Sequence, residues 1–161
     1  MRVAHDVYAE TNPAFCAVVL AEFTKAYVST QPAGLETPVA YIALPVALSG
    51  ELAGAFDGTN KNTGLLEWLE RSPQVQVGLA ERVNASLEIV SDALRFGCFM
   101  GILAIGDRAR LQLGEKKVKP SAINALGEEP GQAIKRATRL GHWFSTAGTT
   151  RAIFDIVGLT V

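Results

Sequence analysis

Residues 86–113 change from a helical to a strand-like hydrophobic period, which limits the folds open to this chain. Leu87, Val90 and Leu94 repeat at i, i+3 and i+7, and this spacing predicts one apolar helical face. The segment Arg95-Phe96-Gly97 predicts the end of that helix, because glycine accepts the left-handed backbone that terminates helices. A helix that runs directly into a hairpin, with helices before it, is typical of a winged helix-turn-helix.

The hairpin is predicted from two short strands, residues 103–105 and 110–113, on either side of Gly106-Asp107-Arg108. Alternation in the second strand predicts two sets of side chains: Ala109, Leu111 and Leu113 facing inward, and Arg110 and Gln112 facing outward.

Cap-and-proline signatures mark the helices near the N-terminus. After residues 1–11, expected to form an ordered arm, Asn12-Pro13 predicts a capped helix over residues 13–28. Thr37-Pro38 repeats the signature, and the apolar run VAYIALPVAL follows it. Its length favours a buried helix kinked at Pro45, with a buried strand as the alternative.

Later segments are also expected to be helical. Residues 49–63 are polar and glycine-rich and predict a surface loop, after which short helices begin near Thr63 and at Ser72-Pro73. Glu128-Glu129-Pro130 begins another helix, where acids favour the positive end of the dipole. Its buried face is expected to hold Ile134, Ala137, Leu140 and Phe144, and a last helix is capped by Thr149 or Thr150 and closed by Gly158.

Together these elements predict a mostly α-helical (α+β) fold in one domain of 161 residues. The winged-helix-like core is expected over about residues 37–114, with the helix at 13–28 and helices over 130–158 packed on it. A hydrophobic content of 48% supplies enough apolar side chains for that core. No run approaches the roughly 20 apolar residues of a membrane span, and the first residues do not resemble a signal peptide, so a cytoplasmic location is expected.

No catalytic, cofactor or metal site is predicted. His5, His142, Cys16 and Cys98 are too far apart to suggest a metal site, and the apolar surroundings of the cysteines indicate buried reduced thiols, with a disulfide as the alternative. No nucleophile-elbow pattern accompanies His142, and no phosphate-binding glycine loop is present.

The hairpin region carries the candidate nucleic-acid contacts. A basic group could meet the DNA backbone or form a solvated loop: Arg108, Arg110, Lys116, Lys117 and Lys119. The helix before it presents Glu88 and Asp92 with Arg95 alone as a cation, which disfavours base reading, and the net charge is −1.

The basic helix near the C-terminus carries the candidate partner interface. Its charged and aromatic side chains are of types enriched at interfaces: Lys135, Arg136, Arg139, His142 and Trp143. Core packing is the alternative for Trp143, as it is for Trp68.

With these residues in view, the sequence resembles the middle-component proteins of bacterial three-component ABC systems, of the MC3-like type. The resemblance rests on motifs in a shared order: Asn12-Pro13-Ala14-Phe15, Tyr27, Pro38 with Leu44-Pro45, Arg95-Phe96-Gly97 with Gly101, Ala137 with Arg139-Leu140-Gly141, Trp143-Phe144, and Ile153-Phe154 with Gly158. It implies a non-enzymatic adaptor that links an SMC/Rad50-like ATPase to an effector in an anti-phage or anti-plasmid defence system. A winged-helix DNA-binding regulator is the alternative function.

Overall fold

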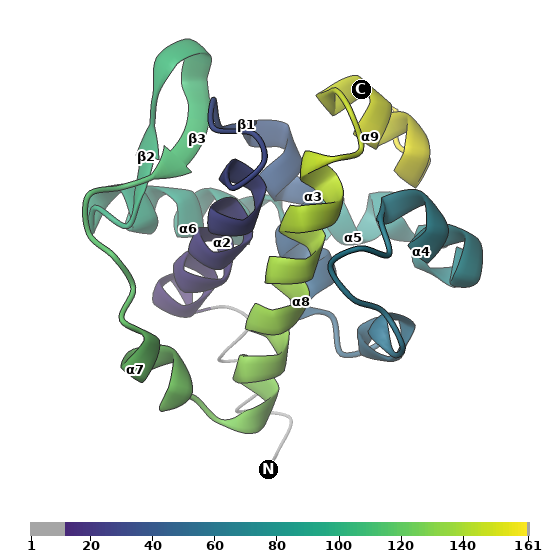
Figure 1. Ribbon diagram of the computed structural model, residues 1–161, viewed down its shortest axis with the longest axis horizontal. Helices are drawn as coiled ribbons and strands as arrows, with labels where there is room; N and C mark the ends of the chain where they lie inside the picture. Colours follow the sequence, from purple (N-terminus) through teal and green to yellow (C-terminus); the bar gives the residue numbers. More distant parts are fainter. Residues whose placement is uncertain (1–11, 161) are drawn as a thin grey trace.

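The computed structural model describes residues 12–160, so the predicted arm over residues 1–11 lies outside them. The helices are α2 (Pro13–Val28), α3 (Thr37–Leu48), α4 (Leu65–Arg71), α5 (Leu79–Ala85), α6 (Leu87–Phe99), α7 (Pro120–Asn124), α8 (Glu128–Ser145) and α9 (Thr150–Val157) (Figure 1). The strands are β1 (Leu35–Glu36), β2 (Leu103–Ile105) and β3 (Arg110–Leu113), and the 3-10 turns are η1 (Ala53–Phe56), η2 (Pro73–Gln76) and η3 (Asp107–Ala109). The mostly helical α+β class is confirmed.

The helix α2 lies at the centre of the fold. It begins as predicted, because Asn12 Oδ1 accepts hydrogen bonds from the N–H groups of Ala14 (2.9 Å) and Phe15 (3.4 Å). It packs against α8, α6 and α3. The α2–α8 contact is very close at Gly141, where an added Cβ would lie 2.3 Å from the main-chain oxygen of Phe23. Only glycine fits at this crossing.

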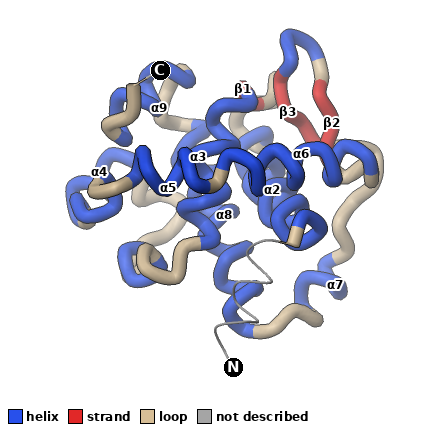
Figure 2. The backbone as a smooth tube through the Cα atoms, turned by 180° about the vertical axis from the view of Figure 1, so that it is seen from behind, coloured by secondary structure: helices blue, strands red, loops and turns tan. Residues whose placement is uncertain are grey.

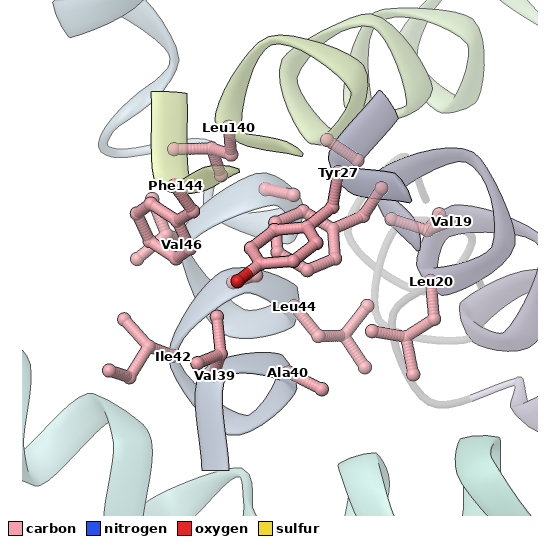
Figure 3. Packing of buried hydrophobic residues seen from close by; sticks show 14 of the residues in the cluster. Val19, Leu20, Tyr27, Val39, Ala40, Ile42, Leu44, Val46, Leu140 and Phe144 are labelled. Atoms are coloured by element: carbon pink, nitrogen blue, oxygen red, sulfur yellow. The ribbon is translucent and has the colours of Figure 1, made fainter. Parts of the chain in front are cut away.

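The run predicted as helix or strand is the helix α3, which continues through Pro45 and begins one residue after Glu36. Its buried side chains include Val39, Ile42 and Leu44, and Figure 3 shows them beside side chains of α2 and α8. One connected cluster of buried apolar residues joins these helices to the sheet. The strand alternative is therefore wrong.

The helix α6 does not stop at Gly97, as predicted, but continues to Phe99. Gly97 is buried inside it, and an added Cβ would lie 2.6 Å from Leu103 Cδ1, so this glycine serves packing. Gly101, at φ +77°, ends the helix instead. The N–H of Ile102 donates to Gly97 O (3.0 Å) and the N–H of Gly101 to Cys98 O (3.2 Å), the pattern of a Schellman motif.

The predicted hairpin strands are confirmed as β2 and β3, and β1 adds a third strand (Figure 2). The strand order is β1-β3-β2, all antiparallel. Leu111 faces the core as predicted. The inward predictions for Ala109 and Leu113 are wrong, because Ala109 lies in the loop at φ +56° and Leu113, at the end of β3, is 40% exposed.

The segment over residues 49–63 is more than the predicted surface loop. Phe56, in η1, is buried against two tryptophans, with ring centroids 4.8 Å from Trp68 and 5.8 Å from Trp143. The segment before α8 contains the short helix α7. Aromatic packing thus holds the first loop against α4 and α8.

Candidate interaction surfaces

The tip of the hairpin carries two of the five predicted DNA-contact residues. Arg108 is exposed and holds a left-handed backbone (φ +58°) in the turn closed by the bond from Gly106 N–H to Arg110 O (2.8 Å). Arg110 is half-buried, and its guanidinium donates to Gly34 O at 3.3 Å. It also lies across the strand pair from Glu36. Arg108 is thus the more accessible cation at the tip.

Lys116, Lys117 and Lys119 lie at the other end of the hairpin. All three are exposed, and the N–H of Lys116 donates to Gly101 O (3.0 Å), which places it beside the end of α6. The four residues of β3 separate this group from the tip by about 13 Å. The five basic residues therefore form two groups, and DNA contact by either stays a prediction.

The acidic side chains on α6 are exposed, as the sequence indicated. Glu88 and Asp92 both face solvent, and Arg95 pairs with Asp92 at 3.1 Å. A single cation already engaged by an acid offers little to a phosphate backbone. This face of α6 is therefore electrostatically unfavourable for DNA.

Two of the predicted partner-interface residues on α8 form hydrogen bonds with other segments of the same chain. Arg136 Nε donates to Ala47 O (2.8 Å), one of the last carbonyls of α3. Burial lowers the pKa of Arg136, and Glu129 opposes that shift. Arg139 donates to Phe56 O (3.1 Å) and to Thr59 Oγ1 (2.9 Å). Both guanidiniums supply hydrogen bonds to main-chain oxygens of earlier segments.

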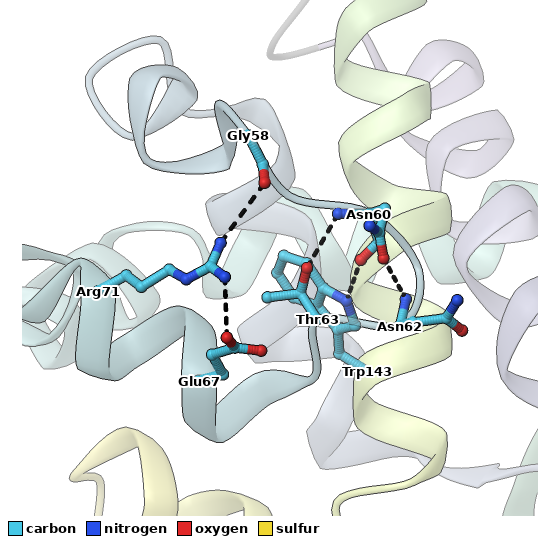
Figure 4. A network of polar contacts seen from close by, with 7 residues as sticks. All are labelled: Gly58, Asn60, Asn62, Thr63, Glu67, Arg71 and Trp143. Carbon is cyan, nitrogen blue, oxygen red and sulfur yellow. Dashed lines mark hydrogen bonds and ion pairs between the residues drawn. The ribbon is translucent and has the colours of Figure 1, made fainter.

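Trp143 is 0% exposed and packs in the core, the alternative that the sequence left open. Its Nε1 donates to Asn60 O (2.9 Å), as Figure 4 shows, so a partner protein has no access to this ring. Lys135 is exposed and His142 is half-exposed. A partner role for the predicted set stays a prediction, and these two residues are the ones at the surface.

An exposed apolar surface that the sequence pattern did not predict lies where α6 ends. The side chain of Phe99 is 87% exposed, and Met100 and Leu113 are also exposed. We call these three residues the α6 apolar end. Lys116 lies next to it through its bond to Gly101. If the helix is extended beyond Gly97 with the same period, Phe99 falls on the side of the helix opposite the buried residues Val90 and Ala93.

Side chains that could bind a metal ion are not gathered in the described part of the chain. Within residues 12–160, no three His, Cys, Asp or Glu side chains come together as metal ligands; His5 lies outside this range. Burial raises the pKa of the free Cys98 thiol, which makes it a weaker nucleophile. None of the described helices is long and apolar enough to cross a membrane.

Comparison with known protein families gives a match that covers almost the whole chain. A family model described as ABC-three component (ABC-3C) system Middle Component 3 matches residues 2–161. No curated protein and no solved structure matches the chain.

Proposed function

The chain belongs to the Middle Component 3 family of ABC-3C systems, and from this premise we propose that it is a non-enzymatic adaptor. It links an SMC/Rad50-like ABC ATPase to an effector in the cytoplasm, as part of an anti-phage or anti-plasmid defence system. Membership of a three-component system supports the existence of protein partners. The exposed α6 apolar end supports a place for one of them.

The α6 apolar end has the chemistry of a protein interface. Burying a phenylalanine side chain is worth about 1.5–3 kcal/mol, and Phe99 leaves that free energy unused at 87% exposure. Aromatic residues and methionine are enriched at the centres of interfaces, whereas lysine belongs to the rim. Phe99 and Met100, with Lys116 beside them, follow that pattern. A partner of the adaptor is expected to cover them.

Reconstitution of the system tests this function. We expect ATPase and effector to copurify in the presence of this chain and to separate in its absence. Phe99→Asp is expected to weaken one of the two contacts by about tenfold or more, as hot-spot residues do. Leu66→Asp is the matched control, since Leu66 is also an exposed helical residue (60%) but lies on α4. An ATPase–effector complex that forms equally well without the chain would exclude the adaptor role.

We also propose that the helices and the sheet form a winged helix in which η3 is the tip of the wing. The order of the elements supports this proposal, because α6 runs through Gly101 into β2 and packs on α2 and α3. An inserted segment, residues 49–85, separates α3 from α6. A solved structure of the chain in which strands of another order follow α6 would contradict it.

A DNA-binding regulator is the second candidate, favoured by the three neighbouring exposed lysines after β3. Phosphate contacts would make binding weaken steeply with salt. The exposed acids on α6 favour non-specific contact over base reading. Gel-shift assays of the isolated chain, at low and at physiological salt, distinguish this function from the adaptor.

A further inference from the structure

A groove with a volume of about 680 Å³ lies between α3, α5 and α9. The helix α3 contacts both α5 and α9, and in Figure 2 α5 lies beside α3 while α9 lies above them. Most of the surface lining it is apolar, with side chains from all three helices, the start of α6 and the tail after α9: Pro38, Ile42, Val83, Leu87, Phe154 and Leu159. Leu87 at its edge is 46% exposed.

Helices and the tail after α9 line the groove, and none of its lining residues belongs to a strand. Tyr41 Oη already bonds Ser91 Oγ at 2.7 Å. Gln76 Nε2 donates to Ile156 O (2.9 Å), which ties η2 to α9. The groove thus offers no strand edge to which an extended peptide could add. An occupant is therefore held by apolar contacts and must satisfy its own backbone, which favours a helix over a strand.

Acidic side chains lie around the groove. A second hollow shares Leu159 and Thr160 with it and is lined by Glu36, Asp155 and one cation, Arg151. Glu88 follows Leu87 in the chain, and Glu81 follows Ala80, which also lines the groove. None of these four carboxylates has an ion-pair partner within residues 12–160, although Arg110 lies across the strand pair from Glu36. The surroundings of the groove are thus negative on balance.

We propose that this groove binds an amphipathic helix with basic flanks, contributed by the ATPase or the effector of the system. Apolar side chains at i, i+3 or i+4, and i+7 would fill the groove, and Lys or Arg beside them would meet Glu88 and Asp155. The inference rests on the proposed adaptor function. It adds a second surface, separate in residues and opposite in charge from the one at Phe99 and Lys116.

Peptides of about 20 residues that tile the ATPase and effector sequences provide the probe. Fluorescence anisotropy with the full chain is expected to find a binder with an apolar helical stripe flanked by Lys or Arg. Its affinity should fall as salt is raised, because the charges at the edge are exposed. Binding only by acidic or uncharged peptides would overturn the proposal.

Two variants locate the binding. Leu87→Asp should lower the affinity for the peptide by about tenfold or more. The variant is expected to fold, because an acidic side chain at the first residue of α6 interacts favourably with the helix dipole. Leu66→Asp should leave the affinity unchanged. The double variant Glu88→Lys/Asp155→Lys should lower the affinity for the peptide about threefold or more and reduce the salt dependence of that affinity. Equal affinity of wild type and Leu87→Asp overturns the groove site.

The outcomes separate this inference from the adaptor function. If the chain is needed for the three-protein complex but no tiled peptide binds, the groove site is excluded and the adaptor stands. If a basic peptide binds in a Leu87-dependent way while the complex forms without the chain, the groove site stands and the adaptor role is excluded.

Discussion

The indole Nε1 of Trp143 donates a hydrogen bond to the main-chain oxygen of Asn60, 2.9 Å away and 83 residues earlier in the chain. The same tryptophan stacks on Phe56, with ring planes 8° apart. A segment rich in glycine and polar residues is thereby fixed to α8 (Figure 4). Arg139, one turn earlier on α8, binds the same segment through Phe56 O.

Replacing Arg139 by alanine is expected to lower the free energy of unfolding by about 1–3 kcal/mol. The change leaves Phe56 O and Thr59 Oγ1 without the donor that they share. Lys135→Ala, at an exposed position of the same helix, is the control and should change stability by less than about 0.5 kcal/mol. Urea denaturation measures both. An Arg139→Ala protein of unchanged stability that no longer binds a partner would assign this residue to an interface instead.

Gly97→Ala is expected to destabilise the fold by about 1–3 kcal/mol, although alanine normally favours a helix. The new Cβ would lie 2.6 Å from Leu103 Cδ1, and the hairpin must move to admit it. Gly131→Ala is the matched control in α8, because nothing lies within 4 Å of its added Cβ. That change should raise stability by about 0.5–1 kcal/mol. Thermal unfolding of the two variants should therefore shift in opposite directions.

The buried phenol of Tyr27 should make stability fall at high pH. Burial is the main cause that raises the pKa of Tyr27 above its ordinary value of 10.0; Arg110 opposes the shift and Glu36 adds to it. The folded state thus favours the neutral phenol, so this contribution is complete below pH 10.0 and is lost as pH rises through the higher folded pKa. Urea midpoints from pH 8 to about 11 should fall less for Tyr27→Phe than for wild type. Parallel curves would show that Tyr27 does not carry this dependence.

Replacing Lys116, Lys117 and Lys119 by alanine separates the two functions. If the chain binds duplex DNA, the triple variant should bind more weakly and with a salt slope that is smaller by about 3, one unit for each phosphate that a lysine no longer neutralises. Arg108→Ala tests the tip of the hairpin independently. If the affinity for DNA is the same as that of the wild type in the triple variant and in Arg108→Ala, the hairpin region is excluded as the DNA-contacting surface.

Local signals predicted much of the fold. Asn12-Pro13 and Thr149 act at helix starts as the sequence indicated, because a cap involves only residues two or three positions apart. The prediction for Gly97 was wrong because a buried glycine and a terminating glycine look alike until the neighbour, Leu103, is known. The strand β1 has two residues, too few to show a period, and exists through its pairing with β3.

The surfaces were harder to predict for the same reason. Arg136 and Arg139 look like solvent-facing cations on a helical wheel, but the oxygens that they bind lie 89 and 83 residues earlier. Phe99 was not predicted as a surface residue because it follows the glycine that was expected to end the helix. The groove combines residues from three separate stretches of sequence, 37–42, 80–87 and 154–160, and no single stretch shows it.

The close crossing at Gly141 has a consequence for the order in which the newly made chain can fold. Phe23 on α2 is synthesised early, whereas its ring neighbour Phe144 and the crossing residue Gly141 come from the other end of the chain. Until α8 leaves the ribosome, the central helix keeps a stripe of aromatic surface exposed. A chain released before α8 is complete would lack its core and would be a substrate for chaperones and proteases. Truncation before the end of α8 should therefore abolish the whole fold.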